Sequence, residues 1–138
     1  MRQLMVLVAG LLLIAGCGAT PATEKHTVSF QLETVNPTAY TDIKAEYAMW
    51  PLAEEKAKAY NTSWKTDVTI HYPDVERVAL TGRIQLNDHV LLPDPGAEST
   101  KLQCQIWVDD VLVAQNVGTA PTCIHIMKAG KQAQVAKS

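Results

Sequence analysis

This chain of 138 residues lacks two features that would mark it as a protein with a membrane-spanning helix or as a nucleic-acid-binding protein. It has no apolar run long enough for a membrane-spanning helix, which needs about 20 consecutive apolar residues; its longest run extends from Leu4 to Ile14. It also has no basic stripe interleaved with aromatic residues, the pattern typical of nucleic-acid-binding proteins, and its formal net charge is −2. We therefore expect no nucleic-acid partner.

Motifs for catalysis and metal binding are missing as well. The histidines form no HExxH, HxH or His/Cys cluster, the spacings that bring metal ligands together; they are His26, His71, His89 and His125. The serines lack the context of a nucleophile elbow, and no glycine-rich phosphate loop occurs. We therefore predict that the protein is not an enzyme and that it holds no metal ion or cofactor.

The N-terminus carries the clearest positive signal. Arg2 precedes the apolar run, as in a secretory signal peptide, and the run ends in Ile14-Ala15-Gly16-Cys17. This exit resembles the bacterial lipobox, in which the cysteine is alkylated before cleavage. We expect residues 1–16 to be removed, Cys17 to carry acyl chains such as palmitate, and residues 17–25 to form a tether. The alternatives are a simple signal peptide with an incidental cysteine, or an uncleaved anchor helix.

The two remaining cysteines form an even pair. Removing residues 1–16 leaves 122 residues (138 − 16), enough for one domain with its own core. Outside the cytoplasm two leftover thiols in a small domain usually bond, and closing a loop of about 20 residues contributes roughly 3 kcal/mol. A redox or metal role is the competing interpretation, but no CxxC occurs and Cys123-Ile124-His125 is poor metal spacing. We predict a structural disulfide between Cys104 and Cys123.

Most of the expected domain, residues 26–127, alternates apolar and polar side chains with the period of a half-buried strand. The alternating segments are 26–33, 42–49, 64–70, 75–86 (bent near Gly82), 101–108, 111–115 and 122–127. Residues 51–60 differ: a first-turn proline, good helix formers and the Glu54–Lys58 pair predict a short surface helix. Several short strands separated by turns predict an all-β antiparallel sandwich.

The last segment, residues 128–138, carries three lysines and no acidic residue. Its composition predicts a disordered basic tail. The alternative is contact with phospholipid head groups, since each basic residue near an anionic surface contributes about 1 kcal/mol.

One strand places a tryptophan on the face opposite the core. If Leu102, Cys104, Ile106 and Val108 face inward, the alternate residues Gln103, Gln105 and Trp107 face outward. Tryptophan is enriched at binding hot spots, so these three residues are our candidate partner-binding surface. Cover by the predicted helix or by a loop is the alternative for Trp107. Trp64 is expected in the core, and Trp50 could go either way.

The same region resembles the mycobacterial MmpS family. Family members show a C-x-I-x-V-D-G strand and turn, a second strand and a closing cysteine; here the pattern is Cys104-x-Ile106-x-Val108-Asp109-Asp110-x-Leu112-Val113, then Gly118 and Cys123. The likeness covers residues 28–127, and its specific part is about twenty residues around the cysteines. It implies an immunoglobulin-like extracytoplasmic domain that works with large MmpL transporters, which export lipids and siderophores.

Three features depart from that family. The family usually begins with a transmembrane helix where this chain has a lipobox, favours Asp-Gly where this chain has Asp109-Asp110, and has a shorter connection at 87–98. The lipobox predicts an envelope lipoprotein, lipid-anchored at the extracytoplasmic face of the cell membrane. The resemblance implies that it acts as an MmpS-like accessory subunit of an MmpL-type exporter. The alternative is a free-standing envelope lipoprotein that binds a small apolar ligand or has a structural role.

The first prediction concerns Cys17. Intact-mass spectrometry of the mature protein should show a chain beginning at Cys17 with diacylglyceryl mass on that residue. Several acyl chains hold a protein at a membrane far more firmly than one myristoyl chain, which is marginal alone. The Cys17→Ala variant should stay unlipidated or unprocessed, and a wild-type mass without added lipid would disprove the anchor.

Overall fold

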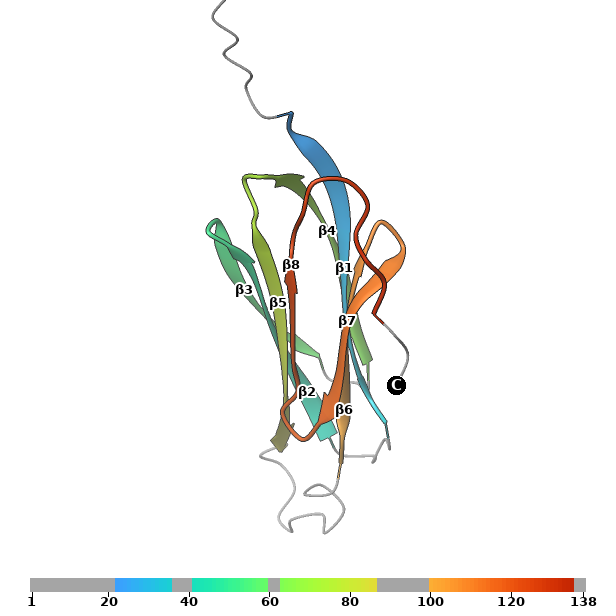
Figure 1. Cartoon of the computed structure of the whole chain (residues 1–138). Coiled ribbons are helices and arrows are strands. Elements are labelled where there is room, and N and C mark those ends of the chain that lie inside the picture. The colour runs from blue at the N-terminus through green and yellow to red at the C-terminus, as the bar shows by residue number, and fades with distance from the viewer. Residues whose placement is uncertain (1–21, 36–40, 60–62, 87–99, 136–138) are drawn as a thin grey trace, which may run out of the picture.

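The computed structural model describes residues 22–35, 41–59, 63–86 and 100–135, which form two antiparallel four-stranded sheets packed face to face (Figure 1). The strand order is β4-β1-β6-β7 in the first sheet and β3-β2-β5-β8 in the second. The predicted all-β sandwich is confirmed at the level of architecture. The strands are β1 (Glu24–Thr34), β2 (Thr41–Trp50), β3 (Ala53–Ala59), β4 (Ser63–Tyr72), β5 (Arg77–Leu86), β6 (Leu102–Val108), β7 (Val111–Gly118) and β8 (Thr122–Ile126).

The core lies between the sheets and is built from the alternating positions of each strand. Val28, Phe30 and Leu32 of β1 are fully buried, whereas the side chains between them are partly exposed. Successive side chains of a strand point to opposite faces, so the period-two pattern read from the sequence becomes one buried and one open face. Trp64 packs against this core, with its ring 5.7 Å from that of Tyr47.

The prediction of a short helix over residues 51–60 is wrong, because this segment contains the strand β3. It pairs antiparallel with β2, from Met49 opposite Ala53 to Ile43 opposite Ala59. Helix propensity and one i,i+4 pair contribute only tenths of a kcal/mol, and a helix of about ten residues is marginal alone. As a strand, the segment instead satisfies the free backbone groups along one side of β2.

The predicted disulfide is confirmed. Cys104 of β6 and Cys123 of β8 are both buried, with their sulfurs 2.02 Å apart and their Cα atoms 6.0 Å apart. Because β6 belongs to the first sheet and β8 to the second, the bond joins the sheets across the core.

The segment after β8, where the sequence predicts a disordered tail over residues 128–138, makes several hydrogen bonds in its described part. Gln132 is buried and its side-chain amide donates hydrogen bonds to the carbonyls of Lys128 (2.7 Å) and Gly130 (3.1 Å). Its Oε1 lies 2.9 Å from Nε2 of His125, and the Val135 amide donates to the Leu112 carbonyl. The side chain of Gln132 thus holds the turn at residues 128–132, and the backbone bond of Val135 holds the chain that follows it. Residues 1–21 and 136–138, including Cys17, lie outside the described part of the chain.

Gly82, where the sequence predicted a bend, marks a close approach of the sheets. Its amide donates a hydrogen bond to the Pro121 carbonyl (2.9 Å), just beyond the last β5–β8 pair. A Cβ atom at Gly82 would overlap Cδ1 of Leu32 and come within 3.0 Å of its Cδ2. Leu32 is fully buried, so it has no free space into which to turn.

We therefore expect Gly82→Ala to lower the free energy of unfolding by about 1–3 kcal/mol, the usual cost of overpacking a core. Gly118→Ala is the matched control, since nothing lies within 4 Å of the added Cβ; it should be neutral or slightly stabilising. Chemical denaturation of both variants measures the difference. Equal stabilities would show that the sheets separate at Gly82 without cost.

Candidate functional site

Trp107 lies on the outward face of the first sheet, near the end of β6. It pairs with Ser29 of β1 and, across a β-bulge, with Leu112 of β7. Its side chain is half-buried. The bulge turns Leu112 to the same outward side, where it is nonetheless buried, because the segment ending at Val135 runs beside it.

A shallow hollow of about 300 Å³ lies beside Trp107 and is open to solvent. It is lined by side chains from three strands and one turn: Ser29, Gln31, Lys65, Trp107 and Asp110. The indole thus has a hydroxyl, an amide, an ammonium group and a carboxylate around it. This set can bind a partner through one apolar contact and several polar ones, the usual composition of a recognition site.

The two glutamines predicted beside Trp107 lie on the same face but do not line the hollow. Gln105 donates a weak hydrogen bond to Gln115 Oε1 (3.4 Å), and Gln103 lies between Glu33 and Val117 further along the strands. The structure thus keeps Trp107 as a candidate and adds residues that the sequence analysis missed. The missed residues have no shared motif; strand pairing alone brings Ser29 of β1 beside β6 and Lys65 of β4 to the far side of β1.

The β6–β7 turn consists of Asp109 and Asp110, and Asp110 borders the hollow. Both residues have positive φ, 49° and 65°, as a type I′ turn requires of its two central residues. Asp109 is held by three contacts: its Oδ1 accepts from the Thr27 amide (2.9 Å), its Oδ2 accepts from Nδ1 of His26 (2.6 Å), and its own amide donates to the Thr27 carbonyl (2.9 Å). The two aspartates thus form the turn between the strands predicted at 101–108 and 111–115.

His26 lies at the centre of a small charged cluster. Its ring is buried, with Nδ1 2.6 Å from Oδ2 of Asp109 and Nε2 3.5 Å from the carboxylate of Glu24. Glu24 also accepts a hydrogen bond from the Gly130 amide (2.7 Å). The cluster therefore joins β1, the β6–β7 turn and the segment after β8.

The pKa of Asp109 reflects these contacts. Partial burial raises it, but the hydrogen bonds from His26 and from the Thr27 amide, together with the charge of His26, outweigh burial and hold the pKa of this carboxyl below its usual value. The charged form is thus favoured in the folded protein. In the described segments, no three His, Cys, Asp or Glu side chains are grouped so that they could hold a metal ion.

A carboxyl with a depressed folded-state pKa stabilises the fold above its unfolded-state pKa and loses that effect as the pH falls through the folded value. We therefore expect Asp109→Asn to be less stable than wild type at pH 7, and the difference to shrink below pH of about 4. Urea denaturation at several pH values measures it. Asp110→Asn is the control, because it removes a charge from the same turn and leaves the acceptor of His26 in place. A constant difference between wild type and Asp109→Asn would contradict the assignment.

No protein-family model matches the chain, and no curated protein matches it. In the residues that the structure describes, no helix is long and apolar enough to cross a membrane.

Proposed function

We propose that this protein is a lipid-anchored, extracytoplasmic lipoprotein that serves as an MmpS-like accessory subunit of an MmpL-type exporter of lipids or siderophores. It acts by binding and not by catalysis. The observation that supports the proposal most directly is the β6–β7 hairpin, which carries the family-like pattern and presents Trp107 on the outward face of the first sheet. The lipobox at Ile14–Cys17 supplies the attachment to the membrane.

The hairpin suits this role because it is held rigidly on three sides. Cys104 fixes its first strand to the opposite sheet, Asp109 is bonded to Thr27 and His26 at the turn, and Leu112 of its second strand accepts a hydrogen bond from Val135. A binding surface that is already ordered loses less conformational entropy when a partner binds. More of the free energy gained from its contacts therefore remains as net binding free energy.

The hollow beside Trp107 fits a protruding part of a larger partner better than a small apolar ligand. Pockets for small ligands usually enclose 70–90% or more of the ligand surface and are mainly apolar, whereas this hollow is open and is lined by Ser29, Gln31, Lys65 and Asp110 around one indole. An extracytoplasmic loop of a transporter could place one side chain against Trp107 while its backbone bonds with the polar rim. This favours the accessory role over a free-standing carrier of a small apolar ligand.

Trp107→Ala should weaken binding to the host's MmpL-type transporter while leaving the fold intact. Truncating a Trp at the centre of an interface typically costs more than about 2 kcal/mol, which is roughly thirtyfold in affinity. The free energy of unfolding should fall by only about 1 kcal/mol, since the side chain is half-buried. Binding to the detergent-solubilised transporter measures the first effect, and urea denaturation measures the second.

Val117→Ala is the matched control, because Val117 is exposed on β7 and lies away from the hollow; it should bind as the wild type does. Deleting the gene in its natural host should also reduce the lipids or siderophores recovered outside the cell. Wild-type affinity for Trp107→Ala together with a large loss of stability would make Trp107 a structural residue and refute this binding face. No binding of the wild-type protein to the transporter would refute the accessory role.

A further inference from the structure

A second surface, on the other sheet, is apolar and exposed. At one end of that sheet Trp50, Arg77 and Ile126 lie side by side on β2, β5 and β8, since Trp50 pairs with Arg77 and Arg77 with Ile126. The Arg77 guanidinium lies over the Trp50 ring, 4.9 Å from its centroid. Even so, 59% of Trp50 and 63% of Ile126 remain exposed. These side chains do not belong to the core between the sheets.

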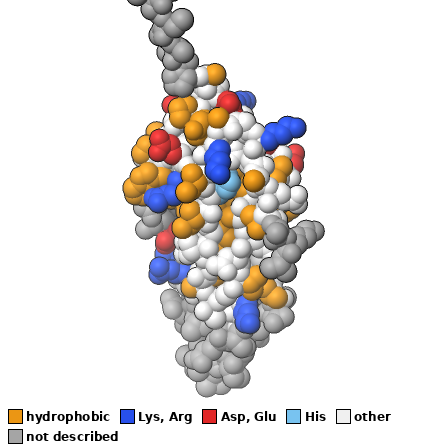
Figure 2. All heavy atoms as spheres, in the orientation of Figure 1, with side chains coloured by type: hydrophobic (Ala, Val, Ile, Leu, Met, Phe, Trp, Pro, Cys, Tyr) orange, Lys and Arg blue, Asp and Glu red, His pale blue; other side chains and the backbone are white. Residues whose placement is uncertain are grey.

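The surface extends beyond this row in two directions. Two residues further along the strands, Ala48, Ala79 and Ile124 form the next row on the same outward face, and Ile124 is 56% exposed. Leu52, in the turn between β2 and β3, is 66% exposed. We call Trp50, Leu52, Ile124 and Ile126 the apolar end surface. Contiguous exposed apolar side chains on a monomer usually mark an interaction site, and Figure 2 shows hydrophobic side chains beside Lys and Arg on the upper part of the molecule.

The backbone beneath this surface is firmly held. The Glu76 amide donates a hydrogen bond to the Trp50 carbonyl (3.0 Å), and the Met127 amide donates to the Glu76 carbonyl (2.9 Å). The side chain of Met127, next to the exposed Ile126, is itself buried in the core. The exposed apolar side chains are therefore displayed on an ordered edge and not on a loose loop.

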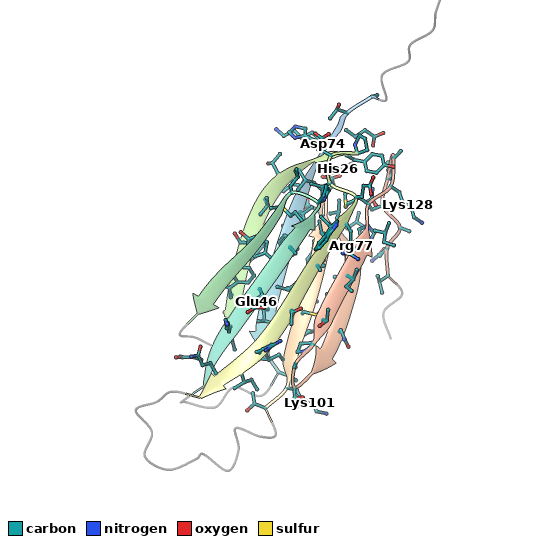
Figure 3. The ribbon with its side chains drawn as sticks, turned by 90° about the vertical axis from the view of Figure 1, so that its left-hand side faces the viewer. His26, Glu46, Asp74, Arg77, Lys101 and Lys128 are labelled. Carbon is teal, nitrogen blue, oxygen red and sulfur yellow. A yellow bond between two sulfur atoms is a disulfide. The ribbon has the colours of Figure 1, made fainter. Side chains whose placement is uncertain are left out.

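The position of the apolar end surface indicates what covers it. β1 begins at Glu24, which pairs with Tyr72 directly before the turn into Arg77, so the tether enters at this end of the sandwich (Figure 1). Figure 3 shows Arg77 and Lys128 at the same end and Lys101 at the opposite end. Seven residue steps (24 − 17) separate Cys17 from Glu24, and at about 3.5 Å each they reach at most roughly 25 Å. A lipid on Cys17 keeps this end near the bilayer.

The chemistry of the surface suits the interface between water and lipid. Tryptophan concentrates at the headgroup level of membranes, and arginine can keep its charge in water while its stem lies on apolar surface. Asp74 and Glu76, both exposed, precede Arg77 and offset the attraction of Arg77 and Lys128 to anionic lipids. Apolar burial is therefore the main driving force, and we expect little dependence on salt.

We propose that the apolar end surface docks on the phospholipid headgroup region of the bilayer to which Cys17 is tethered. The domain then lies against the membrane in one orientation, with the outer face of the first sheet turned away from the lipid. The proposal rests on the lipid anchor of the proposed function. Its occupant is the bilayer itself, and a protein partner at this surface would contradict it.

The test uses the mature chain, residues 17–138, coupled through Cys17 to a maleimide phospholipid in nanodiscs. Cys17 is the one free thiol, because Cys104 and Cys123 are bonded. Spin-labelled lipids should broaden the amide NMR signals of Trp50, Leu52, Arg77 and residues 124–126 most strongly, and those around Lys101 and Val117 least. The pattern should persist at about 1 M salt, where the Debye length falls to roughly 3 Å.

The Trp50→Ser/Ile126→Ser double variant should lose this pattern and broaden evenly over its surface, with a nearly unchanged melting temperature because both side chains are exposed. Val117→Ser, which removes an exposed apolar side chain at the opposite end, should keep the wild-type pattern. Even broadening in the wild type, broadening centred on another face, or protection of the surface only after a transporter is added would overturn the proposal. Chemical coupling holds the chain at the bilayer whether or not cells acylate Cys17, so failure of docking and failure of lipidation are distinguishable.

Discussion

The close packing of the two sheets is the constraint on which the rest of the structure depends. Leu32 fills the space beside Gly82, where no side chain fits, and the Cys104–Cys123 bond joins the sheets across the same core. Only a short distance between the sheets permits both. That distance also fixes β6, because Cys104 cannot move without β8, and with β6 it fixes the direction in which Trp107 points. The recognition face of the first sheet is thus set by contacts on its opposite side.

The sequence predicts this core well because each inward position repeats with period two. The strands around Phe30, Ile43 and Ile106 follow from that pattern, and the cysteine pair follows from simple counting. The helix predicted over residues 51–60 is the exception. The residues of β3 prefer helix locally, yet pairing with β2 makes the segment a strand. Local propensity contributes tenths of a kcal/mol, whereas pairing satisfies whole rows of backbone groups.

The candidate sites are likewise predictable from the sequence only in part. The outward phase of Trp107 can be read from its own strand, but Ser29, Gln31, Lys65 and Asp110 become its neighbours only through pairing across sheet and turn. The apolar end surface is harder still to predict. Trp50 and Ile126 are 76 positions apart (126 − 50), and an isolated exposed apolar residue in a sequence is ordinary. Their juxtaposition becomes visible only when β5 places Arg77 between them.

The two surfaces lie on opposite sheets, and this arrangement makes the two proposals compatible. A domain that rests on lipid through Trp50 and Ile126 leaves the outer face of β4-β1-β6-β7 uncovered. Trp107 pairs with Ser29, half-way along β1 from the end where the tether enters. A transporter loop that emerges from the membrane beside the domain would meet Trp107 without crossing the full length of the sandwich. Docking would also remove most rotational freedom of the tethered domain before a partner arrives, and less entropy would then be lost on binding.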